Sequence, residues 1–173
     1  MKIYIISGKS GSGKTRVGRI IKDYYFNLDK KCIMTEFSKY LKLYAKEIIG
    51  WDYHDPKPRA FLQTIGSEIR NDNELFLVNR MLEDIRIYEK HADVLVISDT
   101  RLPQEIESLK SKFNDVISIY VKNEFGPSKL SIEEQKDITE NGFPSDYPFD
   151  YVIINDTEDT LDDKVINIIK EID

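Results

Sequence analysis

The sequence of 173 residues is poor in the residues that build disulfides and metal sites. It has one cysteine, Cys32, and two histidines, His54 and His91. A single cysteine cannot form an internal disulfide, which fits a reducing cytoplasm. The two histidines lack the spacing of metal ligands. No stretch approaches 18 consecutive apolar residues, so no segment is expected to span a membrane. We therefore expect a cytoplasmic protein with no membrane partner.

Positive charge is also in short supply. The chain has 25 Lys and Arg against 31 Asp and Glu, a formal net charge of −6 at pH 7. This balance argues against binding of polymeric nucleic acid by bulk attraction, but a local basic cluster can still hold a small anion. Low-complexity tracts, repeats and linkers are absent, so residues 1–173 are expected to form one domain. Because a strand is predicted to begin at residue 2, no cleaved signal sequence is expected.

Short apolar runs alternate with segments of helical periodicity. Strands are predicted at 2–7, 31–35, 93–98, 116–121 and 150–154, and helices at 14–26, 36–49, 59–71, 74–90, 104–113 and 158–172. This alternation predicts right-handed crossovers, and hence a three-layer α/β fold with a five-stranded parallel sheet flanked by helices. Ligands of such sheets bind at the carboxyl ends of the strands. We therefore expect the chemistry just after each predicted strand.

The most informative stretch directly follows the first predicted strand. Gly8-Lys9-Ser10-Gly11-Ser12-Gly13-Lys14-Thr15 matches G-x-x-x-x-G-K-[ST], the phosphate-binding P-loop. Its three glycines allow positive φ angles, which turn backbone N–H groups into a nest for phosphate oxygens. Lys14 would reach the β- and γ-phosphates, and the Thr15 hydroxyl would ligate Mg²⁺. The motif predicts nucleotide binding.

The motif alone leaves the reaction open, because P-loop proteins include kinases, GTPases and several ATPases. A typical GTPase carries N-K-x-D after a late strand, whereas the late strands here end in Val121-Lys122-Asn123-Glu124 and Asn155-Asp156. No transporter-type signature or arginine-finger segment of an oligomeric ATPase is present. The chain is close to the minimum size of a P-loop domain, which favours a compact small-molecule kinase.

A second candidate site follows the third predicted strand. Asp99 stands at the carboxyl end of that strand, where the fold places groups that meet Mg²⁺ or a phosphoryl acceptor. Arg101, two residues later, can point toward the same phosphates. The alternative is that Asp99 only caps the following helix and Arg101 is solvated.

A third candidate is the basic face of the helix predicted at 59–71. Arg59, Gln63, Gly66 and Arg70 are spaced i, i+4, i+7 and i+11, so they share one face. Arginine forks hold phosphate bidentately, and glutamine offers a donor and an acceptor to a base edge. The face is therefore interpreted as the wall of an anion site, and a solvated charged face is the alternative.

The order of these motifs resembles that of the deoxynucleoside monophosphate kinases of phages and bacteria. The resemblance rests on the P-loop and on Phe37-Ser38-Lys39-Tyr40-Leu41-Lys42, Lys57-Pro58-Arg59-x-x-Leu62-Gln63-x-x-Gly66-x-Glu68-x-Arg70, Asp99-x-Arg101-x-Pro103-x-Glu105 and Phe149 to Thr157. It implies transfer of the γ-phosphoryl group of ATP, with Mg²⁺, to a nucleoside monophosphate. Dephospho-coenzyme A kinases share part of the pattern.

The resemblance also implies roles for individual residues. Gly8 to Thr15 would hold the ATP phosphates, and Thr15 and Asp99 would lie at the metal. Lys14, Asp99 and Arg101 would be catalytic, with Asp99 organising metal and water rather than acting as an essential base. Asn155 to Thr157 would lie along the adenine. The acceptor site would be lined by Arg59, Gln63 and Arg70.

Two departures from the family pattern stand out. An acid common after the second strand is replaced by Lys39, with Glu36 nearby. The predicted flap at 122–149 has no arginine, although such kinases usually place one over the transferring phosphate. Substitution by Arg16 or Arg19 of the first helix and low activity are the two possibilities. A kinase of dephospho-coenzyme A and a nucleotide-binding switch without turnover stay open as alternatives. Whether the protein is a monomer or a homodimer is also open.

Overall fold

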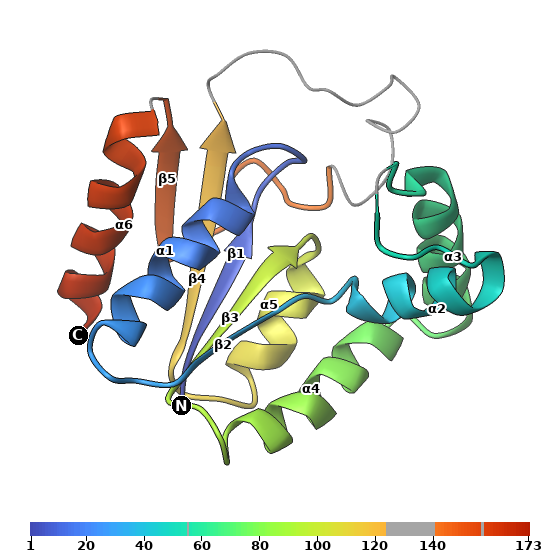
Figure 1. Ribbon diagram of the computed structural model, residues 1–173, viewed down its shortest axis with the longest axis horizontal. Helices are drawn as coiled ribbons and strands as arrows, with labels where there is room; N and C mark the ends of the chain where they lie inside the picture. Colours follow the sequence, from blue (N-terminus) through green and yellow to red (C-terminus); the bar gives the residue numbers. More distant parts are fainter. Residues whose placement is uncertain (55, 124–140, 157) are drawn as a thin grey trace.

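The computed structural model describes residues 1–54, 56–123, 141–156 and 158–173. Its centre is a five-stranded, all-parallel sheet with the strand order β2-β3-β1-β4-β5 (Figure 1). The strands are β1 (Lys2–Ser7), β2 (Cys32–Thr35), β3 (Val94–Thr100), β4 (Val116–Asn123) and β5 (Tyr151–Asn155). The predicted three-layer α/β fold is confirmed, and every strand begins and ends within two residues of its predicted range.

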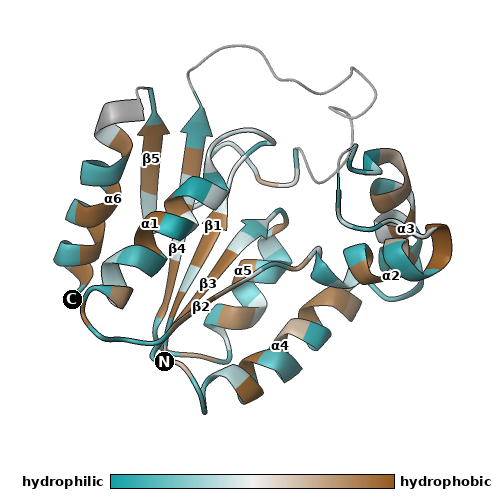
Figure 2. Cartoon of the chain, in the orientation of Figure 1, coloured by the Kyte–Doolittle hydropathy of each residue, from teal (hydrophilic) through white to brown (hydrophobic). Residues whose placement is uncertain are grey.

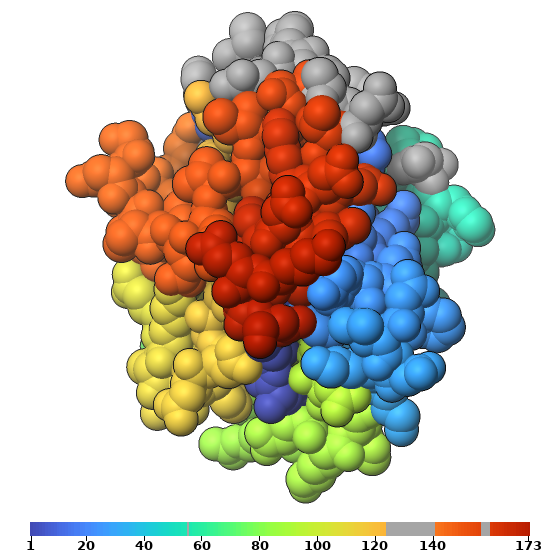
Figure 3. All heavy atoms as spheres, turned by 90° about the vertical axis from the view of Figure 1, so that its left-hand side faces the viewer, coloured from blue at the N-terminus to red at the C-terminus, as the bar shows by residue number. Residues whose placement is uncertain are grey.

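Helices cover both faces of the sheet (Figure 1). In the described part of the chain they are α1 (Lys14–Phe26), α2 (Lys39–Ile49), α3 (Arg59–Asp72), α4 (Phe76–Tyr88), α5 (Pro103–Lys110) and α6 (Glu158–Ile172). Helices α1 and α6 lie side by side on one face, as Figure 3 also shows. Helices α4 and α5 lie on the other face, and α2 and α3 pack together beyond the carboxyl end of β2. No helix in the described residues is long and apolar enough to cross a bilayer.

The central strand shows why the sheet is buried on both sides. Ile3 and Ile5 belong to the core beneath α4 and α5, whereas Tyr4 and Ile6 belong to the core beneath α1 and α6. Successive side chains of a strand point to opposite faces, so the four central residues of β1, from Ile3 to Ile6, must all be hydrophobic (Figure 2). The sheet is thereby a rigid base for the loops at its carboxyl edge.

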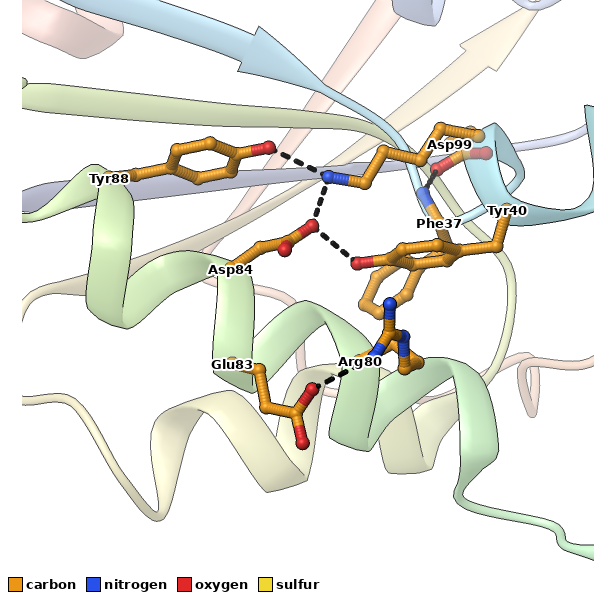
Figure 4. A network of polar contacts seen from close by, with 8 residues as sticks. Phe37, Tyr40, Arg80, Glu83, Asp84, Tyr88 and Asp99 are labelled. Carbon is orange, nitrogen blue, oxygen red and sulfur yellow. Dashed lines mark hydrogen bonds and ion pairs between the residues drawn. The ribbon is translucent and has the colours of Figure 1, made fainter. Parts of the chain in front are cut away.

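The start of α2 is fixed to α4 by hydrogen bonds (Figure 4). The Lys39 ammonium donates to Asp84 and, over 2.7 Å, to the Tyr88 hydroxyl, both on α4. The Tyr40 hydroxyl donates to the same Asp84 carboxylate over 2.6 Å. Burial raises the pKa of Asp84, but these donors and their charges outweigh it and hold the pKa below its usual value. The α2–α3 pair is thus anchored to the body of the domain at one end.

Candidate functional site: the P-loop and the pocket beside it

The P-loop leaves β1 and enters α1 with the backbone that its glycines predict. Gly8, Gly11 and Gly13 have φ angles of 141°, 75° and 102°. Gly13 is the N-cap residue of α1 and provides no side-chain cap, so the first-turn N–H groups face the loop. A helix N-terminus of this kind attracts anions through its N–H groups and its dipole.

The Lys14 side chain lies inside the P-loop and contacts its backbone. Its side chain is 7% exposed, and its Nζ donates to the carbonyl oxygens of Gly8 and Lys9, over 2.7 Å in each case. An ammonium held against backbone carbonyls in the middle of a phosphate nest is placed to exchange those partners for phosphate oxygens.

The last two strands of the chain support the loop. A Cβ added at Gly8 would lie 2.4 Å from the Val121 carbonyl oxygen, so the loop passes directly over the end of β4. The Asn155 side chain, at the end of β5, donates through Nδ2 to the Ser12 carbonyl oxygen over 3.0 Å. Asn155 is therefore placed as a support of the loop, which sequence reasoning did not foresee. Thr157, predicted beside it, lies outside the described residues.

Orphaned polar atoms gather at this edge of the sheet. In the part of the chain that the structure describes, four buried side-chain atoms lack a hydrogen-bond partner: Ser7 Oγ, Ser12 Oγ, Thr100 Oγ1 and Asn155 Oδ1. Each belongs to the P-loop or to the carboxyl end of β1, β3 or β5. Because buried polar atoms are normally paired, their concentration here fits a site built for a polar ligand.

A pocket of about 330 Å³ opens beside the loop, and we call it the cationic pocket. Among its described lining residues, six basic side chains outnumber three acidic ones: Lys14, Lys42, Lys57, Arg59, Arg70 and Arg101 against Glu36, Asp99 and Glu105. The pocket unites the P-loop with β3 and the α2–α3 pair, and its excess of positive charge suits a polyanion. It brings together the predicted Thr15, Asp99, Arg101, Arg59, Gln63 and Arg70.

Asp99 reaches this pocket from the end of β3, and its carboxylate is held by backbone. Oδ1 accepts the Phe37 N–H over 2.7 Å, and Oδ2 accepts the Ser38 N–H over 2.9 Å. The carboxylate therefore joins β3 to the segment that starts α2 (Figure 4). Each oxygen keeps lone-pair capacity for one further contact, such as a metal-bound water.

Arg101 is positioned by the buried carboxylate of Glu105. Glu105 Oε2 accepts the backbone N–H groups of Arg101 and Leu102, over 2.7 and 3.1 Å, and caps the start of α5. Burial raises the Glu105 pKa to about 7, with Asp99 adding to the rise and the N–H donors and Arg70 opposing it. The Arg101 side chain extends to the P-loop, where Nη1 lies 3.5 Å from the Gly8 carbonyl oxygen.

The basic face of α3 forms the opposite wall. Arg59, at the first turn, places Nη1 3.5 Å from the Ser10 hydroxyl of the P-loop. Gly66 lets α3 approach α2, because a Cβ there would lie 3.1 Å from Leu41 Cδ1 and 3.3 Å from a terminal nitrogen of Arg70. Arg59, Gln63 and Arg70 line the pocket from the same helix, as their spacing predicts, and Leu62 lines it as well.

Sequence reasoning assigned no role to Lys57, Lys42 or Glu36. Lys57 precedes α3 and lines the pocket, and its pKa is lowered by burial and then by the nearby charge of Lys42. The acid after β2, Glu36, forms an ion pair with Lys42. Lys57 stood in the motif that carried the resemblance, but only the folded pocket shows that it is partly buried among other cations.

The arginines proposed to replace a flap arginine lie elsewhere. Arg16 forms an ion pair of 3.1 Å with Asp162 of α6. Neither Arg16 nor Arg19 is among the lining residues described for the cationic pocket. Most of the predicted flap, residues 124–140, lies outside the described residues, so its arrangement stays a prediction. The described part of the chain holds no cluster of three or more His, Cys, Asp or Glu suited to a metal ion.

No family model and no curated protein matches this sequence. Solved structures do share its fold. A putative kinase from Chloroflexus aurantiacus superposes with a TM-score of 0.55 at 11% identity, covering 98% of this chain and 94% of that one. The APS kinase of Mycobacterium tuberculosis in complex with AMPPNP and APS gives a TM-score of 0.51 at 12% identity, with 98% and 95% covered.

Thymidylate kinase from Ehrlichia chaffeensis gives a TM-score of 0.50 at 13% identity, covering 97% of this chain and 98% of the other. All three likenesses extend over nearly the full length of both chains. At these identities they are evidence about the fold and not about the substrate. The chain therefore has the fold of the P-loop kinases.

Proposed function

We propose that this protein is a kinase that transfers the γ-phosphoryl group of ATP to a nucleoside monophosphate. The observation that carries the proposal is the cationic pocket, in which the P-loop residues Lys14 and Thr15 face Arg70 and Arg101 across one cavity. A donor-phosphate site and a second set of cations in the same pocket suit a reaction between two phosphate groups. Phosphoryl transfer requires mainly positioning and cancellation of negative charge.

The chain's own residues divide this work. The P-loop N–H groups and Lys14 would bind the donor phosphates, with Lys14 leaving the carbonyls of Gly8 and Lys9 to do so. Arg59, Arg70 and Lys57 would hold the acceptor phosphate, and Arg101 would neutralise charge between the two. The acceptor is already an anion, so no strong base is needed, and Asp99 would organise metal and water.

Mg²⁺ fits the oxygen donors of this pocket. Thr15 and Asp99 both line it, and a hydroxyl and a carboxylate are the hard ligands that Mg²⁺ prefers. When bound, the ion would neutralise charge on the donor phosphates. A location in the cytoplasm, where ATP and nucleotides are available, belongs to the same proposal.

The test is ADP release from ATP and Mg²⁺ with a panel of nucleoside monophosphates and with dephospho-coenzyme A. Transfer to one or more nucleoside monophosphates is expected. Transfer to dephospho-coenzyme A alone would replace the proposed acceptor. Tight ATP binding without ADP release above background for any acceptor would instead indicate a nucleotide-binding switch.

A further inference from the structure

A larger cavity of about 710 Å³ lies on the other side of the P-loop from the cationic pocket, and we call it the aromatic cavity. Its walls come from the first residues of the P-loop, the ends of β3 and β4, and the segment 141–149 that leads into β5. The volume lies in the range of small-molecule binding sites. No step proposed above uses this cavity.

Four aromatic rings line one side of it. Tyr120 of β4 packs on Phe149 with ring centroids 5.0 Å apart, and Phe149 packs on Phe143 and Tyr147 at 4.9 and 4.8 Å. The four side chains are partly exposed, and Phe143, Tyr147 and Phe149 pack against the core beneath α4 and α5. They form a continuous aromatic wall supported from behind. Such rings bind planar bases by stacking, which requires few specific hydrogen bonds to the base.

The charges around this cavity select for an anionic ligand. Lys9, Arg101 and Lys122 are among its lining residues, and the described lining includes no aspartate or glutamate. An aromatic wall with basic residues at its border suits a planar base that carries a phosphate.

The two cavities meet at the P-loop. Ser10 and Arg101 line both of them. The cationic pocket supplies many cations, but its aromatic residue, Phe37, is only 3% exposed and has no free ring face. Charge recognition and base recognition are therefore separated, with the junction at Arg101.

We propose that the aromatic cavity binds the nucleobase of the acceptor, whose phosphate reaches Arg59, Arg70 and Lys57 of the cationic pocket through the Ser10–Arg101 junction. This inference rests on the proposed function and names where its acceptor is recognised. The expected orientation of ATP agrees with this assignment of the acceptor, because a P-loop lysine contacts the β- and γ-phosphates. Lys14 lines the cationic pocket next to Arg101, so the junction is at the reactive end of the donor.

The adenine of ATP is the competing occupant, and the lining argues against it. The P-loop residues of the aromatic cavity are Gly8, Lys9 and Ser10, at the start of the loop. Gly13 and Asn155, at the other end of the loop, contact each other closely and are not among the described lining residues. The donor nucleoside is expected on that second side.

The variant Phe143→Leu tests this assignment, because it removes a ring while keeping an apolar side chain. Phe113→Leu is the matched control, since Phe113 packs on the same core but belongs to neither described lining. Each protein is assayed with the preferred nucleoside monophosphate and with ribose 5-phosphate as a competitive inhibitor. Ribose 5-phosphate keeps the sugar and phosphate but has no base.

For Phe143→Leu we expect the KM for the nucleoside monophosphate to rise roughly 10-fold. The inhibition constant of ribose 5-phosphate and the KM for ATP should stay unchanged, and Phe113→Leu should resemble the unmodified protein. Equal loss of affinity for both acceptor-site ligands would show general loosening and overturn the inference. A rise in the KM for ATP alone would assign the cavity to the donor.

The proposed function can fail separately. If the unmodified protein transfers phosphate to no nucleoside monophosphate, the kinase proposal falls, and calorimetric binding of the same nucleotides still tests the cavity. Weaker binding to Phe143→Leu than to Phe113→Leu would support the aromatic cavity as a base site. Equal binding to both variants would reject it.

Discussion

The two sides of the candidate site differ in their chemical groups, since backbone forms one side and charged side chains form the other. On the proposed donor side, a glycine-rich loop has the positive φ angles of a phosphate nest, and the ends of β4 and β5 support that loop. On the proposed acceptor side, long charged side chains from α3, from the residue after β3 and from the segment before α3 line one pocket. Backbone geometry leaves a strong local mark in the sequence, whereas a convergence of side chains depends on packing. The P-loop side of the site is therefore easier to predict from the sequence than the opposite side.

The largest expected effect belongs to Lys14, because it lies between the two halves. Lys14→Ala should lower kcat by at least about 100-fold, as loss of a preorganised charge-stabilising donor does. The fold should persist, since the ammonium contacts backbone carbonyls at the site and not the core. Initial rates and thermal unfolding check both statements, with the exposed Lys22 of the same helix changed to alanine as control. Near-normal turnover would refute the donor assignment.

The next effect concerns the pH dependence of the acceptor side. The pKa of Glu105 is raised from 4.5 in the unfolded chain to about 7 in the folded protein. Between these values the folded protein keeps a proton that the unfolded chain has lost, so this group lowers the stability as the pH rises through that window. The loss amounts to about 3 kcal/mol and is complete above pH 7.

Glu105→Gln removes this titration while its amide oxygen can still accept the N–H groups of Arg101 and Leu102. The free energy of unfolding, measured in urea at several pH values, should fall less steeply with pH for the variant than for the unmodified protein. Glu107→Gln, an exposed change on the same helix, is the control. Parallel pH profiles for all three proteins would mean that Glu105 is ionised at an ordinary pKa.

A change at Arg70 should separate acceptor binding from donor binding. Arg70→Ala is expected to raise the KM for the acceptor roughly 10-fold, because a hydrogen bond to a charged group contributes about 1.5–3 kcal/mol. The KM for ATP should change little, since the P-loop is untouched. Arg86→Ala, an exposed change on α4, serves as control. A matching rise in both KM values would show that the two halves are not independent.

The smallest expected effect tests the support of the loop. Asn155→Ala removes the hydrogen bond to the Ser12 carbonyl and should weaken ATP binding by about 1 kcal/mol, roughly 5-fold. The KM for the acceptor should not follow. Calorimetric titration with a non-hydrolysable ATP analogue measures the change directly. Unaltered affinity would assign Asn155 to folding alone.

The sheet and its helices could be predicted because their signals are local. Continuous apolar runs predicted β3 and β5, and helical periodicity predicted α1 with both of its ends. The helix predicted at 36–49 begins at Lys39 instead, since the backbone at Phe37 and Ser38 is bonded to Asp99, 61 or more residues away in the chain. No local pattern encodes such a partner.

The parts of the candidate site that lie close together in the sequence could be predicted, whereas the parts that depend on packing between elements could not. Arg59, Gln63 and Arg70 repeat along one helix, so their common wall could be foreseen, although their roles stay predictions. The partial burial of Lys57 and the capping role of Glu105 arise only when separate elements pack together. The aromatic cavity combines β4 with an irregular segment of no periodicity, so it became visible only in the fold.

The contact between Asn155 and Ser12 has a consequence for the order in which the protein matures. The ribosome makes the P-loop before β4 and β5, the two strands that support it. A growing chain that ends before residue 151 carries the complete phosphate-binding motif without the strand that steadies it. In the proposed kinase, firm binding of nucleotide would therefore follow the synthesis of β5 rather than the synthesis of the motif itself.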